Sequence, residues 1–426
     1  MHFDIVIVGG GAGGLELAAQ LGRRLGKQEG RERVLLIDKF PFHIWKPTLH
    51  EVAAGTLDAH QEGLSYTVLA RRNHFSFMLG ELTAFDAAKK SVTLAPLRND
   101  RGQEIVPERR ISFQKLVLAL GSGSNSFGTP GIENAYLLEN VRDAQLFHAD
   151  WLNACAHAAY AEHKSLSVAI VGAGATGVEL SAELIESHTA LLESLGSNQR
   201  FRLDIFLVEG GDRILGGLPP RISEQAAVAL ERKQVRVLTK TRVEALEPGR
   251  LVTSGGVIAA DMIVWAAGIK AADTNKTLGL EVNRLNQLVV DDHLRASNPD
   301  VLAIGDCAAC PWVDGKIVPA RAQAAHQQAS YLAQVLKAFL HQGNVDKPFV
   351  YRDFGSLVSL GDNKGVGSLM GGLGGRNFFV QGLLAKWMYM SLHLNHHIAI
   401  LGLSQTVVLA MARLLQQRVS GRLKLH

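Results

Sequence analysis

Two segments of the chain share one pattern of hydrophobic and polar positions. Each begins with a nearly continuous, β-branched apolar run, residues 3–8 and residues 167–171. Each run leads into a glycine-rich stretch and then into apolar positions at helical spacing. Apolar runs without polar alternation are typical of parallel strands buried on both faces. The pattern therefore predicts two strand–turn–helix units in an α/β chain.

The glycine-rich stretches have a common spacing, G-x-G-x-x-G. The glycines are Gly9, Gly11 and Gly14 in the first unit and Gly172, Gly174 and Gly177 in the second. The first glycine permits a tight turn, the second lets a diphosphate approach the backbone, and the third lets the helix pack closely. A further strand in each unit ends in an acid, Asp38 or Glu209, suited to bind ribose hydroxyls. The alternative is that both turns are purely structural. The strand, the glycines, the helix and the acid occur together twice, however, which favours two dinucleotide sites.

The second unit has a longer interval between glycines and acid. We expect the polar stretch 186–200 to be a lengthened helix and loop that absorbs the excess. Glu209 would repel a 2′-phosphate, which favours NADH over NADPH, although Arg213 is a contrary sign. Residues 115–120 and 262–267 are predicted strands that end in Gly121 and Gly268.

Beyond these units, residues 300–306 form the last strand that the pattern predicts, and residues 320–340 a helix. From about Gln381 the chain is apolar with helical periodicity. No stretch reaches the roughly 20 apolar residues that a membrane-spanning helix needs. The opening apolar run is a strand, so no export signal is expected.

Charge is unevenly distributed. The 426 residues carry a net charge of +4, but Asp362 is the last acid, and seven cations follow it. Residues 1–362 therefore hold 37 cations and 40 carboxylates. A basic, apolar tail favours an anionic membrane surface over nucleic acid as a partner, although the cations could merely solvate a helix.

Composition narrows the class further. Hydrophobic residues make up 47% of the chain, which excludes a disordered protein. Three cysteines suit a reducing compartment. Cys307 and Cys310 form a C-x-x-C pair that we interpret as structural, and no metal site is expected because no second such pair exists.

Several stretches carry a resemblance. The paired fingerprints, with Gly121, Gly268 and Gly305-Asp306, resemble the two-dinucleotide-binding-domain flavoproteins. Within that superfamily, residues 45–53, 174–184, 319–327 and 422–426 resemble the bacterial type II NADH:quinone oxidoreductases. The resemblance covers essentially the whole chain. It implies FAD and NADH as cofactors, a membrane quinone (ubiquinone or menaquinone) as acceptor, and no proton pumping.

The resemblance also assigns residues to the cofactors. The residues implied for FAD are Gly9, Gly11, Ala12, Gly13, Gly14, Asp38, Lys39, Lys46, Pro47, Gly121, Gly305, Asp306 and Gln323. The residues implied for NADH are Gly172, Gly174, Thr176, Gly177, Glu179, Glu209, Ala267 and Gly268.

Catalytic roles are implied for Glu179, Gln323, Lys46 and His326. Quinol formation needs two protons whereas NADH supplies a hydride, so a carboxylate or imidazole near the flavin could relay the second proton. Taken without the resemblance, Glu179 would be a helix-face acid, His326 a solvated or capping histidine, and Gln323 an exposed helix residue.

The tail has one apolar helical stripe, formed by Val380, Leu383, Trp387, Met390, Leu394, Ile398 and Leu401. The 15 uncharged residues between His397 and Arg413 are too few to span a bilayer but suit one leaflet. The stripe could instead pack on the body or form a homodimer interface. We expect a peripheral membrane protein on the cytoplasmic face of the bacterial inner membrane.

The sequence therefore predicts an α/β fold of two Rossmann-like dinucleotide-binding domains, the NADH domain inserted in the FAD domain, plus a C-terminal helical membrane-docking segment. The expected ranges are 1–145 and 271–350 for FAD, 146–270 for NADH and 351–426 for docking. A soluble reductase of a ferredoxin or disulfide, and a flavin-bound redox sensor, are the alternatives. A sulfide:quinone oxidoreductase would need cysteines flanking the flavin, and Cys155 has no partner in sequence.

Overall fold

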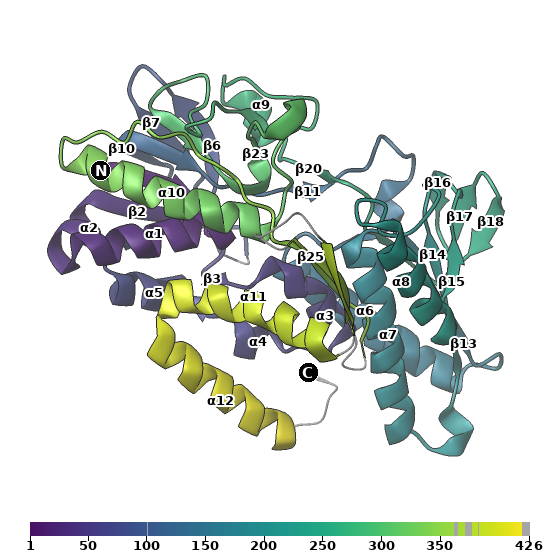
Figure 1. The fold of residues 1–426 in the computed structure, drawn as a ribbon. Helices are drawn as coiled ribbons and strands as arrows, with labels where there is room; N and C mark the ends of the chain where they lie inside the picture. The colour runs from purple at the N-terminus through teal and green to yellow at the C-terminus, as the bar shows by residue number, and fades with distance from the viewer. Residues whose placement is uncertain (100, 362–364, 371–376, 382, 420–426) are drawn as a thin grey trace.

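A computed structural model describes residues 1–99, 101–361, 365–370, 377–381 and 383–419. It consists of two α/β domains and a C-terminal helical pair (Figure 1).

The first domain is built on a seven-stranded sheet. Its strands, in spatial order, are β5 (Ser76–Leu79), β2 (Val34–Asp38), β1 (His2–Val8), β10 (Arg109–Leu118), β7 (Ser91–Leu94) and β6 (Leu82–Asp86), with β22 (Val301–Ala303) also paired to β10. β1 runs parallel to β2 and β10, and its Ile5–Val8 segment is buried, as the unbroken apolar run predicts. Helices α1 (Ala12–Leu25) and α10 (Ala322–Leu340) pack side by side against this sheet (Figure 1).

The second domain is built on a five-stranded parallel sheet. Its strands, in order, are β12 (Tyr136–Leu137), β19 (Met262–Trp265), β13 (Ser165–Val171), β14 (Arg202–Val208) and β15 (Arg236–Leu238). Its helices are α6 (Val141–Tyr160), α7 (Ala175–Ser194) and α8 (Pro220–Arg232). The chain leaves the first sheet after β10 and returns to it at β22, so the second domain is inserted into the first. Because β12 precedes residue 146, the second sheet takes its first strand from the range that the sequence assigned to the first domain.

Shorter elements connect these sheets. Around the first sheet they are α2 (Lys27–Arg33), β3 (Phe42–His43), η1 (Lys46–Thr48), α3 (Leu49–Ala54), α4 (Ala59–Glu62), β4 (Leu64–Ser65), α5 (Tyr66–Asn73), β8 (Leu97–Arg98), β9 (Glu104–Val106) and β11 (Gly123–Ser124). Later in the chain they are η2 (Ile132–Asn134), η3 (Ser197–Gln199), β16 (Val243–Glu247), β17 (Arg250–Thr253), β18 (Gly256–Ala259), β20 (Ile269–Lys270), α9 (Thr274–Thr277), β21 (Leu288–Val289), η4 (Gly305–Cys307), β23 (Ala308–Ala309) and η5 (Val313–Gly315). α7 and η3 confirm the lengthened helix and loop expected over 186–200. Cys155, Cys307 and Cys310 are free and buried.

The expectation that residues 300–306 form the last strand is wrong. A three-stranded antiparallel sheet follows, made of β24 (Gly355–Ser359), β25 (Gly365–Met370) and β26 (Asn377–Gln381). Glycine and serine make up three of the five residues of β24, so its local strand propensity is low. Its strand conformation depends on pairing with β25, which the sequence pattern does not reveal.

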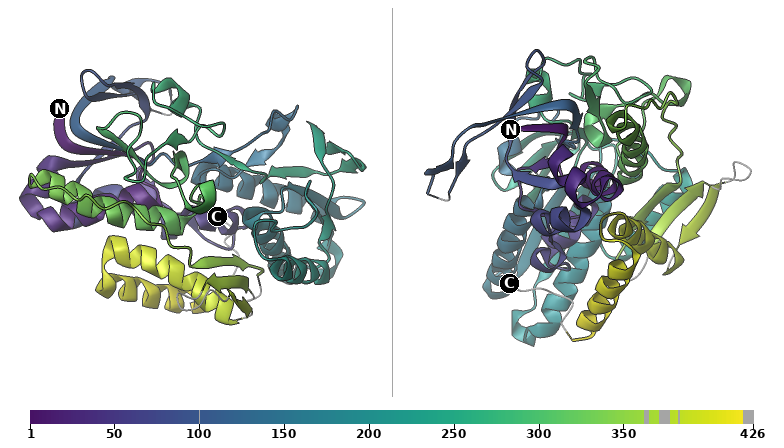
Figure 2. Two further views of the ribbon diagram at one scale, coloured as in Figure 1. Left: turned by 45° about the horizontal axis from the view of Figure 1, so that its top comes forward. Right: turned by 90° about the vertical axis from the view of Figure 1, so that its left-hand side faces the viewer.

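The chain then forms two helices, α11 (Leu383–Leu401) and α12 (Leu403–Val419), separated by Gly402 at φ +81°. α11 packs on α1 and α5, and α12 lies on the outer side of α11 (Figures 1 and 2). The side chains of the first four stripe positions, Val380, Leu383, Trp387 and Met390, lie outside the described residues. Among the helices of the described chain, none combines the length and apolar character that crossing a membrane requires.

Candidate functional site: two dinucleotide-binding turns and a buried carboxylate

The first glycine-rich turn joins β1 to α1 and uses each glycine differently. Gly9 has a φ of +104°, and a Cβ there would lie 2.2 Å from the Ala119 carbonyl oxygen. A Cβ at Gly14 would lie 1.9 Å from the Gly9 carbonyl oxygen, so the helix can approach the strand only without a side chain. Around Gly11 nothing lies within 4 Å of the Cβ position. The middle glycine therefore leaves open space at the N-terminus of α1, where free amide groups favour a bound anion.

The second turn, between β13 and α7, repeats this geometry. Gly172 has a φ of +98°, and its Cβ would lie 2.6 Å from the Cα of Ala267. A Cβ at Gly177 would lie 2.0 Å from the Gly172 carbonyl oxygen, whereas around Gly174 nothing lies within 4 Å. Both turns therefore have the local geometry that the spacing predicts for a diphosphate site.

The two acids also occupy matching positions. Asp38 accepts hydrogen bonds from the backbone amides of Gly10, at 2.6 Å, and Phe40, at 2.8 Å. Glu209 accepts bonds from the amides of Ala173, at 2.8 Å, and Gly211, at 2.7 Å. Burial raises the pKa of Asp38 although these amides act against the rise. Each acid therefore fastens its glycine-rich turn to the following strand, a second task besides binding a ribose.

A cavity of about 570 Å³ opens beside the first turn. Its lining includes six of the residues implied for FAD, namely Gly9, Gly11, Asp38, Lys39, Lys46 and Gly121. Volumes of roughly 300–1,000 Å³ are usual for cofactor sites. The open space at Gly11 and the size of the cavity fit an extended dinucleotide.

Other residues implied for FAD lie around this cavity without lining it. Gly13 packs beneath the turn, where a Cβ would lie 3.1 Å from the Ile304 side chain. Ala12 begins α1, and Pro47 is an exposed residue of η1. The hydroxyl of Ser122, which lines the cavity, donates to Asp306 at 2.9 Å. Gly305 has a φ of +73° and donates its amide proton to Gln328 at 2.7 Å.

The residues implied for NADH cluster at the second turn. Gly174 and Thr176 are exposed, and Gly268 follows β19 at a φ of +65°. The backbone of Ala267 contacts Gly172, so the strand-end glycine motif and the nucleotide turn lie together. Arg213, the contrary sign for NADPH, donates to the carbonyl groups of Leu218 and Gly216, so its guanidinium is engaged within its own loop.

Glu179 lies in the second turn of α7 and is 6% exposed. It accepts a hydrogen bond from the Ser359 amide at 3.0 Å, and its other oxygen lies 3.6 Å from Nδ1 of His50. Burial raises the pKa of Glu179 from 4.5 to about 8, and burial lowers the pKa of His50 to about 4. A carboxyl group that titrates near neutral pH can both donate and accept a proton, which suits an acid–base role.

Gln323 is not an exposed helix residue. Its side-chain amide donates to the carbonyl of Gly355 at 2.9 Å and accepts from the amide of Phe354 at 3.1 Å. It therefore holds the start of β24 against the N-terminus of α10. Lys46 donates to the Ser122 carbonyl at the cavity wall.

His326 is partly solvated, as the residue alone suggests, and it is also the partner of a buried acid. Its Nδ1 lies 2.5 Å from Glu16 in α1, and Glu16 also pairs with His396 of α11 at 2.6 Å. Sequence reasoning missed Glu16, His396 and His43 because their contacts join positions more than 300 residues apart. The one available sign was the recurrence of glutamate two positions after the third glycine, at Glu16 and Glu179.

Comparison with known proteins agrees with the geometry of the two nucleotide turns. The model of the pyridine nucleotide-disulphide oxidoreductase family matches residues 3–329. A type II NADH:quinone oxidoreductase from Haemophilus influenzae is 39% identical, with 99% of this chain and 100% of the relative covered. One from Staphylococcus aureus is 30% identical over 86% of this chain and 90% of the relative.

Solved structures show the same fold. The NDH2 structure from Plasmodium falciparum in complex with NADH superposes with a TM-score of 0.82, at 18% identity, over 99% of both chains. The sulfide:quinone oxidoreductase of Aquifex aeolicus superposes at 0.72, with 16% identity, over 94% of this chain and 92% of that chain. With both nucleotide turns formed, the family model matching residues 3–329 and a 39% identical relative covered over its full length, the chain belongs to the pyridine nucleotide-disulphide oxidoreductase family and, within it, to the type II NADH:quinone oxidoreductases.

Proposed function

We propose that this chain is an FAD-dependent NADH:quinone oxidoreductase that does not pump protons. The observation that carries the proposal is the pair of complete nucleotide turns, one of which opens into a dinucleotide-sized cavity. A bound FAD would supply the redox chemistry, namely hydride acceptance from NADH and two-electron transfer to a quinone. The chain's own residues bind and orient the two nucleotides, exclude water and hold protons.

Each turn binds its nucleotide through the same groups. The free amides at the start of α1 and of α7 would hold a diphosphate, and Asp38 and Glu209 would accept hydrogen bonds from ribose hydroxyls. Gly305-Asp306, fastened to Ser122, would hold the far end of FAD. Burial of Glu179 keeps a proton available at neutral pH, so Glu179 would exchange a proton between solvent and the quinone.

Absorption spectroscopy tests the cofactor assignment. The purified protein should be yellow, and NADH should bleach it without oxygen. Glu209→Ala should weaken NADH binding at least tenfold while FAD stays bound, and Asp38→Ala should do the opposite. Asp212→Ala, at an exposed acid beside Glu209, is the matched control and should change neither. A colourless protein, or equal loss of both cofactors in both variants, would contradict the assignment.

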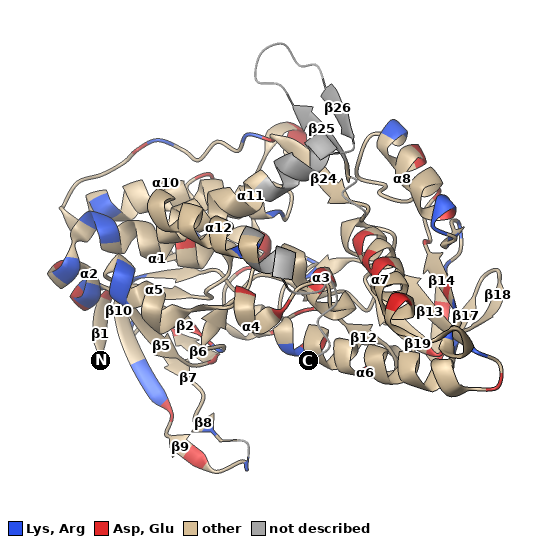
Figure 3. Ribbon diagram, turned by 90° about the horizontal axis from the view of Figure 1, so that it is seen from below, with Lys and Arg blue, Asp and Glu red and all other residues tan. Residues whose placement is uncertain are grey.

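We further propose that α12 rests on a lipid surface containing anionic lipids. Five apolar side chains on α12 are half to two-thirds exposed, namely Leu403, Val407, Val408, Met411 and Leu415. Figure 3 shows the first half of α12 without charged positions. An exposed apolar face on a surface helix suits a membrane interface, where a hydrophobic quinone dissolves.

The face differs from the stripe that the sequence singled out. Of the described stripe residues in α11, Leu394 and Leu401 are partly buried, whereas Ile398 is 37% exposed. Arg413, one of the seven tail cations, is paired with Glu62 of α4. That cation is therefore committed to an ion pair, and the apolar face of α12 provides the main support for docking.

Liposome flotation tests the docking face. Val408→Glu should reduce the bound fraction of the full chain at least fivefold on vesicles of mixed zwitterionic and anionic lipid. Val228→Glu is the matched control, because Val228 is also exposed on a helix, 45% on α8, and should leave binding unchanged. Equal flotation of both variants would overturn the assignment of α12.

A further inference from the structure

Four ionisable side chains from four segments form one hydrogen-bonded row through the interior. His326 of α10 lies 2.5 Å from one carboxylate oxygen of Glu16, and His396 of α11 lies 2.6 Å from the other. The Nε2 atoms of His396 and His43 are 2.9 Å apart. Nδ1 of His43 lies 3.0 Å from the Gly10 carbonyl oxygen, which also accepts from the Tyr66 hydroxyl at 2.7 Å.

The row connects solvent to the dinucleotide cavity. The side chain of His326 is 46% exposed, whereas those of Glu16 and His396 are each 1% exposed. His43 is buried and lines the 570 Å³ cavity beside Lys46 and Asp38. Buried polar groups are costly unless they are paired, and each buried member of this row has a hydrogen-bond partner on both sides.

The Gly10 carbonyl fixes where the protons in this row lie. A carbonyl oxygen can only accept, so Nδ1 of His43 carries a proton. Nε2 of neutral His43 is then an acceptor, and the proton of the next bond comes from Nε2 of His396. A neutral His396 would present a bare Nδ1 to Glu16 at 2.6 Å, where two lone pairs would repel. The bond to Glu16 therefore requires one further proton.

The row therefore holds one proton more than an ionised carboxylate and two neutral imidazoles would hold. The residues that share this proton are Glu16, His396 and His43. It can reside on Glu16, on His396 or, after one more transfer, on His43. Each transfer moves a proton along an existing hydrogen bond, so no side chain has to rotate. We call these three residues the proton array.

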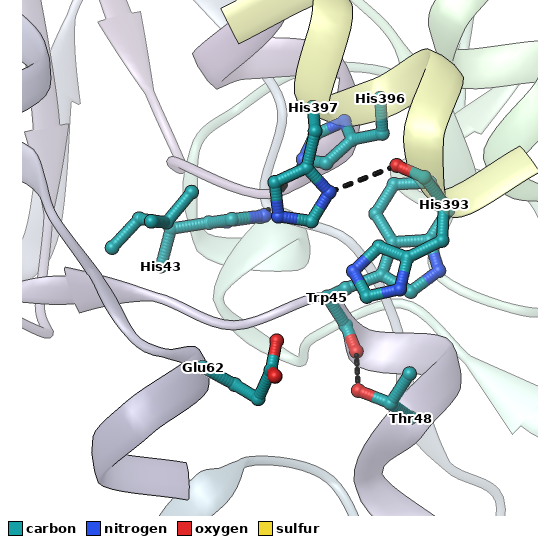
Figure 4. A pocket seen from close by; sticks show the side chains of 8 residues that line it. His43, Trp45, Thr48, Glu62, His393, His396 and His397 are labelled. Atoms are coloured by element: carbon teal, nitrogen blue, oxygen red, sulfur yellow. Dashed lines mark hydrogen bonds between the residues drawn. The ribbon is translucent and has the colours of Figure 1, made fainter. Parts of the chain in front are cut away.

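The surroundings insulate the proton array from bulk water. Trp45 covers His396 at a ring-centroid distance of 4.2 Å. The chamber beside the array in this region has a volume of about 10 Å³, room for a single water, and His43 and His396 line it together with Thr48, His393 and His397 (Figure 4).

Charged and titratable groups face the proton array from each packed element. They are Arg23 on α1, Glu62 on α4, Tyr66 on α5, and His393 and His397 on α11; Arg413 on α12 reaches this group through its ion pair with Glu62. Burial alone would raise the pKa of Glu16, but the bonds from His326 and His396 lower it overall. Burial and then the charge of His396 lower the pKa of His43 far below its usual value. At rest the shared proton therefore lies between Glu16 and His396.

We propose that the proton array takes up one solvent proton through His326 when electrons enter the dinucleotide cavity. The inference rests on the proposed function. NADH delivers two electrons and one proton, which leaves one added negative charge in the cavity. The shared proton then moves to His43, Glu16 becomes free to take the proton of His326, and His326 regains one from solvent. Reoxidation reverses the charge, so the array gives up its proton as quinone takes two electrons and two protons to become quinol.

None of the three residues is placed at the reacting atoms, so they act as positioning residues for a proton. This role differs from that of Glu179, which lies on the other nucleotide unit and has no bond to the row among the interactions of the described residues. The array and Glu179 can therefore be tested separately.

Proton uptake during reduction is the first test. The holoenzyme is reduced without oxygen by one equivalent of NADH in weak buffer containing a pH indicator. The wild type should take up about one proton more per reduced flavin than Glu16→Gln, since the protonation of the flavin itself is common to both. His163→Gln, at an exposed histidine remote in sequence from the row, is the control and should match the wild type. Equal uptake in Glu16→Gln and wild type would overturn the proposal.

Nuclear magnetic resonance of ¹⁵N-histidine-labelled wild-type holoenzyme is the second test, and it needs neither turnover nor a variant. His43 should show a protonated Nδ1 and a bare Nε2 at pH 7, with one strongly downfield proton shared between Glu16 and His396. A bare Nδ1 on His43, or the absence of that proton, would overturn the inference even where Glu16→Gln fails to fold. Failure of NADH to bleach the wild type would instead overturn the proposed function, and the resonance result would then still decide whether the shared proton exists.

Discussion

Glu16 and Glu179 occupy the same place in the two nucleotide-binding units. Each is the second residue after the third glycine of its turn, each lies on the helix that follows, and each is buried, at 1% and 6% exposure. Two histidines contact Glu16 and lower its pKa against the effect of burial. Beside Glu179 lies His50, whose pKa of about 4 leaves it neutral, and burial raises the pKa of Glu179 to about 8.

The difference shows that burial sets only part of a carboxyl pKa. Removal from water favours the protonated form of both residues, and only a nearby group able to donate a proton or a positive charge reverses this. One repeated motif thus gives two chemically distinct carboxyl groups: one shares a proton in a row, and the other titrates by itself near pH 8.

The largest expected effect is a loss of native folding, and it tests whether the two nucleotide turns are equivalent. Gly14→Ala and Gly177→Ala place a methyl group 1.9 Å and 2.0 Å from a carbonyl oxygen, so each domain should fail to reach its native packing. Gly11→Ala and Gly174→Ala have open space and should fold, but they should lose nucleotide affinity. Circular dichroism and cofactor content measure the two effects. Normal folding of Gly177→Ala would show that the turns are not equivalent.

Removing the histidine beside each glutamate tests the difference between the two sites. His396→Leu leaves Glu16 with one partner and His43 with none on that side, and should lower the free energy of unfolding by about 3 kcal/mol. His50→Leu removes a neutral group 3.6 Å from Glu179 and should cost about 1 kcal/mol. Urea unfolding at pH 7 compares the variants. Losses of similar size in the free energy of unfolding would mean that Glu16 interacts with its partners no more strongly than Glu179 does.

The pH dependence of stability gives a smaller effect than the loss of His396. Because the folded-state pKa of Glu179 is raised from 4.5 to about 8, the folded protein retains a proton that the unfolded chain releases. Wild-type stability therefore falls as pH rises from about 4.5 to 8, through this residue. Glu179→Gln removes this dependence, so its stability relative to wild type should rise by about 2 kcal/mol between pH 6.5 and pH 9. Parallel stability curves for the two proteins would contradict the raised pKa.

Much of the architecture could be predicted because it depends on neighbouring residues. The apolar runs of β1 and β13, the spacing of the glycines and the acids Asp38 and Glu209 all act within single strand–turn–helix units. The expected insertion of the second domain is confirmed by the return of β22 to β10. The tail was harder to predict: the three-stranded sheet from β24 to β26 was missed, and the predicted apolar stripe runs along α11, where Leu394 and Leu401 are partly buried.

The sequence by itself determined the two nucleotide-binding turns, since hard-sphere contacts within a few residues demand glycine at fixed positions. Only the tertiary structure decided which carboxyl group keeps its charge. The partners of Glu16 come from α10 and α11, 310 and 380 positions away, and local patterns carry no information about which helices meet. The same holds for the tail, where packing on α1 and α5 buries one face of α11 and leaves the apolar side chains of α12 exposed.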